Sequence, residues 1–159
     1  MPNFNSMKEL EMFLLLKVQK AMSTTVATEV KQLESDNVKE VVYNTYTPRE
    51  YIRRGDNGGL SDLTNIKHEI FSGGNMVVLN VENNTMSNQN YNPNNKDPFA
   101  LAGLVEYGDG SGYGEYDFMG SSDYLKPRKF IEKTKQDLQN GKAKEILVKA
   151  LLNEGIQSM

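Results

Sequence analysis

The feature that most constrains the fold is a long helical pattern near the start of the chain. No glycine or proline occurs between Met7 and Thr47, and Pro48 is the first residue to interrupt the run. Apolar side chains recur there at steps of three and four residues, the period of one face of an α-helix. They are Leu10, Phe13, Leu14, Val18, Met22, Val26, Val30 and Leu33. The pattern predicts one helix to about residue 35, or two helices with a break near residues 23–25.

The start of this helix carries two further signals. Ser6 and Glu9 have the spacing of a capping box, in which the two side chains bind the first free backbone N–H groups. The run from Met12 to Leu16 is apolar on more than one side of the helix. We therefore expect cover on more than one side, either from the core or from another subunit, and we take Met12 and Phe13 as candidate interface residues.

The middle of the chain predicts β-structure. Residues 38–45 fit a helix or a strand. Ile66, His68 and Ile70 share one face of an expected strand over residues 63–71. Residues 72–75 (Ser-Gly-Gly-Asn) predict a turn, and residues 76–81 a second strand, so the two strands form an antiparallel hairpin.

The helical pattern returns after the middle of the chain. Residues 99–107 fit a short helix or a strand. Pro127 is expected in the first turn of a helix that places Phe130 and Ile131 in the core. Asn140-Gly141 predicts a turn before a last amphipathic helix over residues 143–152.

Two polar or glycine-rich segments separate these elements. Residues 83–98 are rich in asparagine, and residues 108–124 alternate glycine with tyrosine, so both predict long exposed loops. The expected fold is α+β in a single domain over residues 1–159. It has a long N-terminal helix, a central, mostly antiparallel sheet, and C-terminal helices packed on the sheet.

Composition excludes several classes of chemistry. The 159 residues include no cysteine and one histidine, which excludes a disulfide framework, a thiolate metal site and a site with several histidines. The net charge of -3 gives no general attraction to nucleic acid or to an anionic membrane. No apolar run approaches the roughly 20 residues of a membrane span, and the N-terminus has no basic-then-apolar signal pattern. A soluble protein of a reducing compartment is expected.

The candidate reactive residues carry little support for catalysis. His68 lies in period with Ile66 and Ile70 and has no serine elbow or carboxylate pair beside it, which favours a structural role. The loop over residues 108–114 resembles a phosphate-binding loop but lacks the lysine that would follow it. Asp109, Glu115 and Asp117 have the wrong spacing for an EF-hand and leave only a weak calcium site open. We therefore expect no enzyme, and no catalytic, metal-binding or cofactor-binding residue.

The basic and aromatic segment over residues 49–54 is the strongest candidate for a binding surface. Arginine and aromatic side chains serve both nucleic-acid contacts and protein interfaces, and the acidic chain favours a protein interface. The candidate interface residues are Arg49, Tyr51, Arg53, Arg54, Met12, Phe13, Tyr91, Tyr113, Tyr116 and Arg128.

Two motifs in order resemble a family of bacteriophage proteins. The first is Val-Tyr-x-x-Tyr-x-Pro-x-x-Tyr-x-Arg-Arg over residues 42–54, with Gly58-Gly59-Leu60 after it. The second is Pro-Arg-x-Phe-Ile over residues 127–131. Together with the long N-terminal helix, they resemble the tail-completion or head–tail joining proteins of long-tailed phages, across roughly residues 10–155. The segments over 83–98 and 108–124 depart from that pattern.

The resemblance implies a structural virion protein without enzymatic activity or cofactor. Such a protein is a subunit of a homo-oligomeric ring, a hexamer, that joins the tail to the connector around the DNA channel. Its partners are other neck and tail proteins, DNA passes nearby without specific binding, and no membrane is involved. The implied location is the virion, and the host cytoplasm during assembly. The alternatives are a tail terminator ring, a small nucleic-acid-binding module that uses Arg49, Arg53 and Arg54, or an enzyme that uses His68 or the loop over residues 108–117.

Overall fold

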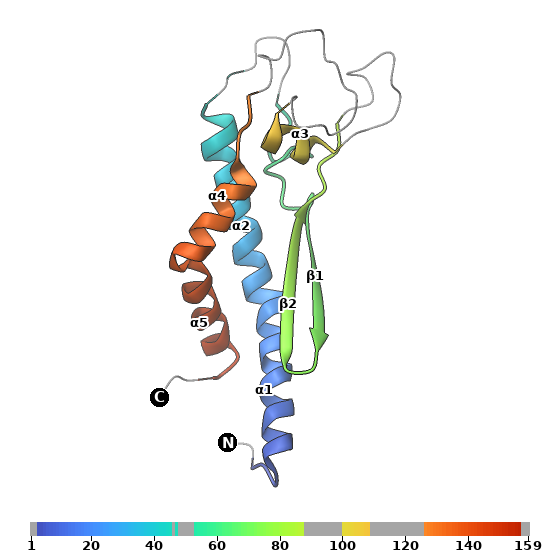
Figure 1. Ribbon diagram of the computed structural model, residues 1–159, viewed down its shortest axis with the longest axis vertical. Coiled ribbons are helices and arrows are strands. Elements are labelled where there is room, and N and C mark those ends of the chain that lie inside the picture. Colours follow the sequence, from blue (N-terminus) through green and yellow to red (C-terminus); the bar gives the residue numbers. More distant parts are fainter. Residues whose placement is uncertain (1–2, 46, 48–52, 88–99, 109–125, 157–159) are drawn as a thin grey trace. The chain divides into compact units, whose positions relative to one another are not determined.

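The computed structural model describes residues 3–45, 47, 53–87, 100–108 and 126–156. The helices are α1 (Met7–Ala21), α2 (Ala27–Asn37), α3 (Leu101–Tyr107), α4 (Phe130–Asp137) and α5 (Ala143–Asn153), and the strands are β1 (Ile66–Gly73) and β2 (Met76–Asn83) (Figure 1). Within these ranges, the π-helical segments η1 (Met22–Val26) and η2 (Val38–Tyr43) adjoin the α-helices. The segment η4 (Leu138–Lys142) contains a kink at Gly141, whose φ of 117° is not helical, so the predicted turn at Asn140-Gly141 is confirmed. The α+β prediction is confirmed, with a long N-terminal helix, a two-stranded antiparallel sheet and C-terminal helices.

The chain divides into two compact units. The first unit comprises residues 1–30, 68–81 and 137–159, and the second comprises residues 31–67 and 82–136. Each unit has its own cluster of buried apolar side chains.

The long helical pattern forms helix throughout its length. The predicted break near residue 24 is the π-helical segment η1, where the Ser23 and Thr24 hydroxyls donate to the Lys20 carbonyl at 3.1 and 2.7 Å. Hydroxyls that bind a carbonyl of the preceding turn compete with the regular helix ladder, which explains the local change of helix type. At the start of α1, Ser6 Oγ accepts from the Glu9 N–H at 3.2 Å, and the Glu9 carboxylate accepts from the Asn5 N–H. The capping role of Ser6 is therefore confirmed.

The predicted hairpin is also present, with Gly74 and Asn75 between the strands. Gly74 has a φ of 59°, a conformation that favours glycine. The Asn84 N–H donates to the Asn65 carbonyl at 2.9 Å, directly beyond the paired strands, which fixes the register: Asn65 faces Asn84, and Gly73 faces Met76.

The core of the first unit joins the helices to the hairpin. Ala21, Val26 and Val30 are buried together with Ile146 and Ala150 of α5, and Leu79 and Val81 of β2 pack against them. This arrangement confirms the predicted apolar face of the last helix.

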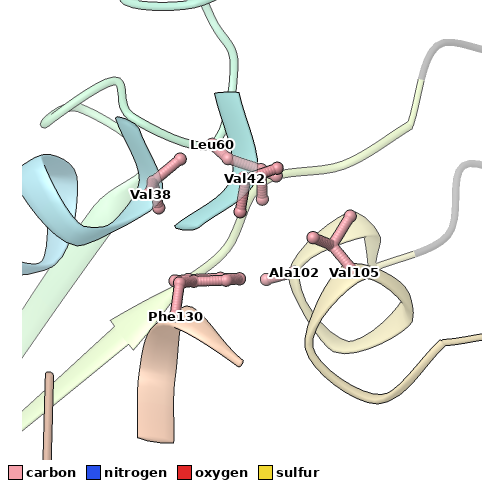
Figure 2. Close-up of a cluster of buried hydrophobic side chains, with 6 residues drawn as sticks. All are labelled: Val38, Val42, Leu60, Ala102, Val105 and Phe130. Carbon is pink, nitrogen blue, oxygen red and sulfur yellow. The ribbon is translucent and has the colours of Figure 1, made fainter. Parts of the chain in front are cut away.

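The core of the second unit is built around a phenyl ring. Phe130 begins α4 and is fully buried, together with Val38 and Val42 of η2 and with Ala102 and Val105 of α3 (Figure 2). Leu60 completes this cluster. The segment over residues 38–45 is therefore helical up to Tyr43, and the segment after residue 99 forms α3.

Three local predictions are wrong. Ile131 is 40% exposed, because one face of α4 is turned outward while Phe130 and Thr134 are turned inward. Pro127 is exposed and precedes the helix, which begins at Phe130. Asn83 is buried at the end of β2 rather than part of an exposed loop.

Replacement of Phe130 by alanine tests the core of the second unit. We expect Phe130→Ala to lower the free energy of unfolding by about 3–5 kcal/mol, because it leaves a ring-sized cavity in a closed cluster. Ile131→Ala is the matched control in the same helix, and its loss should be below about 1 kcal/mol. Denaturant unfolding of both variants measures the difference, and equal losses would contradict the described core.

Candidate functional site

The candidate interface arginines of the described segment bind the chain itself. Arg53 Nη1 donates to the Tyr43 carbonyl at 2.7 Å, and the guanidinium carbon lies 5.0 Å from the centre of the Tyr43 ring. Tyr43 ends η2, so the positive charge of Arg53 lies at the negative end of a helix. The Tyr43 hydroxyl accepts from the Ser61 N–H at 3.3 Å, which extends this contact toward the loop before β1.

Arg54 makes a similar contact with a different segment. Its Nη2 donates to the Met86 carbonyl at 2.6 Å, just after β2. Both arginines therefore hold backbone carbonyls within the second unit. Their contact with a partner protein stays a prediction.

Arg128 lies where α3 and α4 are joined by hydrogen bonds. Its backbone N–H donates to the Val105 carbonyl at 2.9 Å, and its carbonyl accepts from the Phe130 N–H. The buried carboxylate of Glu106 accepts from the N–H groups of Ile131 and Glu132 at 2.8 and 3.0 Å. Glu106 thus caps α4 from a neighbouring helix, where a negative charge and the free N–H groups stabilise each other.

A buried polar cluster, missed by the sequence analysis, is centred on the Asn83 side chain. Asn83 Nδ2 donates to Glu34 Oε1 at 3.0 Å and to the Leu60 carbonyl at 2.9 Å. Its Oδ1 accepts from the Thr85 hydroxyl at 2.6 Å and from the Thr85 N–H at 3.2 Å. Both donors and both acceptor positions of the amide are used, so the cluster is satisfied without a ligand. The only sequence signal is an Asn-x-Thr step at the start of the asparagine-rich stretch.

Glu34 is the titratable group of this cluster. Burial raises its pKa above the usual value, the Asn83 hydrogen bond lowers it in part, and the charge of Glu106 raises it further. A carboxyl with a raised pKa is a common feature of acid catalysts. Here Glu34 accepts from Asn83, and Glu106 caps α4, so each of the two carboxyls has a hydrogen-bond partner within the fold.

The apolar residues of α1 divide between covered and uncovered positions. Phe13 is half-buried, with its ring centre 5.1 Å from that of Phe4 and 5.8 Å from the Lys17 ammonium. Met12 and Leu16 are 58% and 63% exposed. The predicted cover on more than one side of residues 12–16 is therefore incomplete within the described part of the chain.

Of the remaining candidates, only His68 lies in the described part of the chain. His68 lies in β1 as expected, but its side chain is exposed. Arg49, Tyr51, Tyr91, Tyr113 and Tyr116 lie outside the described residues, as do Asp109, Glu115 and Asp117. Among the residues that the structure describes, no three acidic or histidine side chains are grouped so as to hold a metal ion. No helix in the same ranges is long and apolar enough to cross a membrane.

A family comparison covers nearly all of these elements. The YomN family model matches residues 6–154, which include both apolar clusters, the hairpin and the Asn83 cluster. The chain belongs to the YomN family. This family is phage-associated, in agreement with the phage origin that the sequence motifs imply. None of the curated proteins and none of the solved structures matches the chain.

The contacts of Arg53 predict a structural effect in this YomN-family chain. We expect Arg53→Gln to lower the melting temperature by several degrees, because it removes a charged hydrogen bond at a helix end and the contact with the Tyr43 ring. Lys129→Gln, at an exposed position of the same unit, is the control. Circular dichroism melts measure both variants, and an unchanged melting temperature for Arg53→Gln would contradict this role.

The raised pKa of Glu34 predicts a pH-dependent effect. Because the folded chain holds this proton more tightly than the unfolded chain, the Glu34 contribution to stability falls as pH rises above the usual value of 4.5. Glu34→Gln keeps an oxygen for Asn83 and removes the buried charge. We therefore expect the variant to be more stable than wild type at pH 7, and the difference to vanish below about pH 4.

Denaturant unfolding across this pH range measures the effect. Glu40→Gln, on the exposed side of η2, is the matched control and should leave the pH dependence unchanged. A Glu34→Gln variant that is less stable than wild type at pH 7 would show that the charged acceptor contributes more than burial costs.

Proposed function

We propose that this chain is a structural protein of the phage virion, a ring subunit at the head–tail junction that holds the tail to the connector around the DNA channel. It acts without catalysis or cofactor, and its partners are further copies of itself and other neck and tail proteins. A hexameric ring is the proposed assembly.

The proposal has support from the sequence and from the family. The phage-associated family agrees with a virion protein. The motif residues have structural tasks in the second unit: Arg53 and Arg54 hold backbone carbonyls, and Phe130 fills the core. Because these motif residues maintain the fold, the resemblance supports a fold shared with the head–tail joining proteins.

The observation that carries the proposal is the uncovered apolar surface of α1. Met12 and Leu16 are four residues apart, so they lie on the same side of the helix, and both are more than half exposed. Met7, on another side, is 71% exposed. A helix with apolar residues on several sides is typical of burial, and an assembly of identical or different subunits supplies that burial.

The charge of the chain fits the proposed position. A net charge of -3 provides no strong attraction to phosphate, and DNA that has to slide through a channel is best served by weak contacts. The same charge argues against the small nucleic-acid-binding module.

Immunogold labelling of intact particles by electron microscopy is the direct test. We expect gold at the head–tail junction, and gold on no part of the particle would refute the proposal. Loss of the protein then separates two ring roles: normal free tails beside DNA-filled heads are expected for joining, whereas tail tubes of abnormal length would indicate the terminator.

Polar substitution of the exposed stripe tests the role of α1. We expect Met12→Ser combined with Leu16→Ser to leave the melting temperature within a few degrees of wild type, because both side chains are mostly in solvent. The same variant should fail to enter particles and should lower the yield of infectious phage at least about a hundredfold in a complementation assay, since two apolar contacts worth roughly 3 kcal/mol would be lost at every subunit contact. Lys8→Ser, one turn earlier on α1, is the control. Normal incorporation of the double variant would exclude this stripe as an assembly surface.

A further inference from the structure

The outer edge of β1 presents unpaired backbone groups. Because Asn65 and Asn84 are hydrogen-bonded across the hairpin, the odd-numbered residues of β1 face β2, and His68, Ile70 and Ser72 direct their N–H and C=O groups away from it. Within the described ranges, no hydrogen bond joins these three residues to a group outside the hairpin. β1 has no proline, and its only glycine is Gly73 at its end. Such an edge accepts a further strand.

The charges on β1 match those of a second, antiparallel β1. Lys67 and Glu69 are exposed, two residues apart and on the same face of the strand. When two copies pair about a two-fold axis at His68, each Lys67 faces Glu69 of the other copy. An axis at Lys67 or at Glu69 places like charges opposite each other, and an axis at Ile70 places Glu69 opposite Phe71. Only the first of these registers joins opposite charges.

The backbone geometry favours the same register. His68 then faces the second His68 as a hydrogen-bonded pair, which uses the N–H and C=O groups that point outward. The Lys67–Glu69 pairs are non-hydrogen-bonded pairs, in which the side chains lie closest together.

We infer that two copies of this chain associate through the edge of β1, as antiparallel strands about a two-fold axis at His68, to form a four-stranded sheet. A two-stranded hairpin is marginal alone, and two more strands stabilise it. The outward face of the hairpin also carries Phe71, Met76 and Val78, with exposed fractions of 55%, 64% and 42%, and pairing places two such sets on one continuous surface. This inference does not depend on the proposed place in the virion.

Charge reversal of the full chain tests the pairing. By sedimentation velocity we expect a concentration-dependent dimer for wild type. Lys67→Glu and Glu69→Lys, each alone, should weaken association by about tenfold to a hundredfold, because each replaces two attractive pairs by two repulsive ones. An equimolar mixture of the two variants should restore the dimer, since every pair in the mixed dimer again joins opposite charges. The double variant should also restore it.

Two outcomes would overturn the inference. One is a monomeric wild type at concentrations well above micromolar, which would mean that the two charges protect the edge from association. The other is a dimer that both single variants leave unchanged, which would place the contact elsewhere, for example on Phe71 and Met76. Lys67 also faces Glu82 across the hairpin, so circular dichroism melts of each variant verify that the monomer is folded. The mixing experiment separates a lost contact from a damaged strand, because a damaged strand is not restored by mixing.

Discussion

The hydrogen bonds of the Asn83 amide hold together three parts of the second unit. The amide reaches Glu34 in α2, the Leu60 carbonyl in the loop before β1, and Thr85 after β2. A side chain smaller or less polar than asparagine leaves a buried carboxyl and a buried carbonyl without partners, which costs more than a lost surface contact. The Phe130 cluster supplies the apolar part of the same unit, and the capping carboxylate of Glu106 positions the helix that begins with Phe130.

The sequence predicted the elements with strong periodicity and missed those that depend on distant partners. The helical pattern from Met7 onward, the hairpin and the last helix follow from local spacing, because each has a regular apolar face. The burial of Asn83 depends on Glu34 and Leu60, which lie far away in sequence, so composition alone placed it in a loop. Ile131 looked equivalent to Phe130, and only the direction from which α3 packs separates the buried residue from the exposed one.

The candidate interface was predictable only in part. Arg49, Tyr51, Arg53 and Arg54 indicated a partner, and the two described members of that set, Arg53 and Arg54, bind carbonyls of their own unit. The same residue types serve both tasks, and nothing local distinguishes a cap on a helix end from a contact with another protein. Met12 shows the opposite difference. Its apolar side chain in a helical pattern predicted burial by the core or by another subunit, and the described part of the chain leaves it exposed to solvent. Within the described part of the chain, the surfaces that we propose for assembly are therefore the apolar stripe of α1 and the outer edge of β1.

The π-helical segment η1 affects which side of α1 is presented to other molecules. Each residue added to or removed from a helix turns everything beyond it by about 100°. Residues 22–26 hold a wider turn, stabilised by hydroxyls that bind the Lys20 carbonyl. A variant of this chain that lacked one residue there would keep a continuous helix and every apolar side chain of α1. It would present a different side of that helix to its surroundings. The π-helical turn at Ser23 and Thr24 therefore determines which side of α1 faces its surroundings.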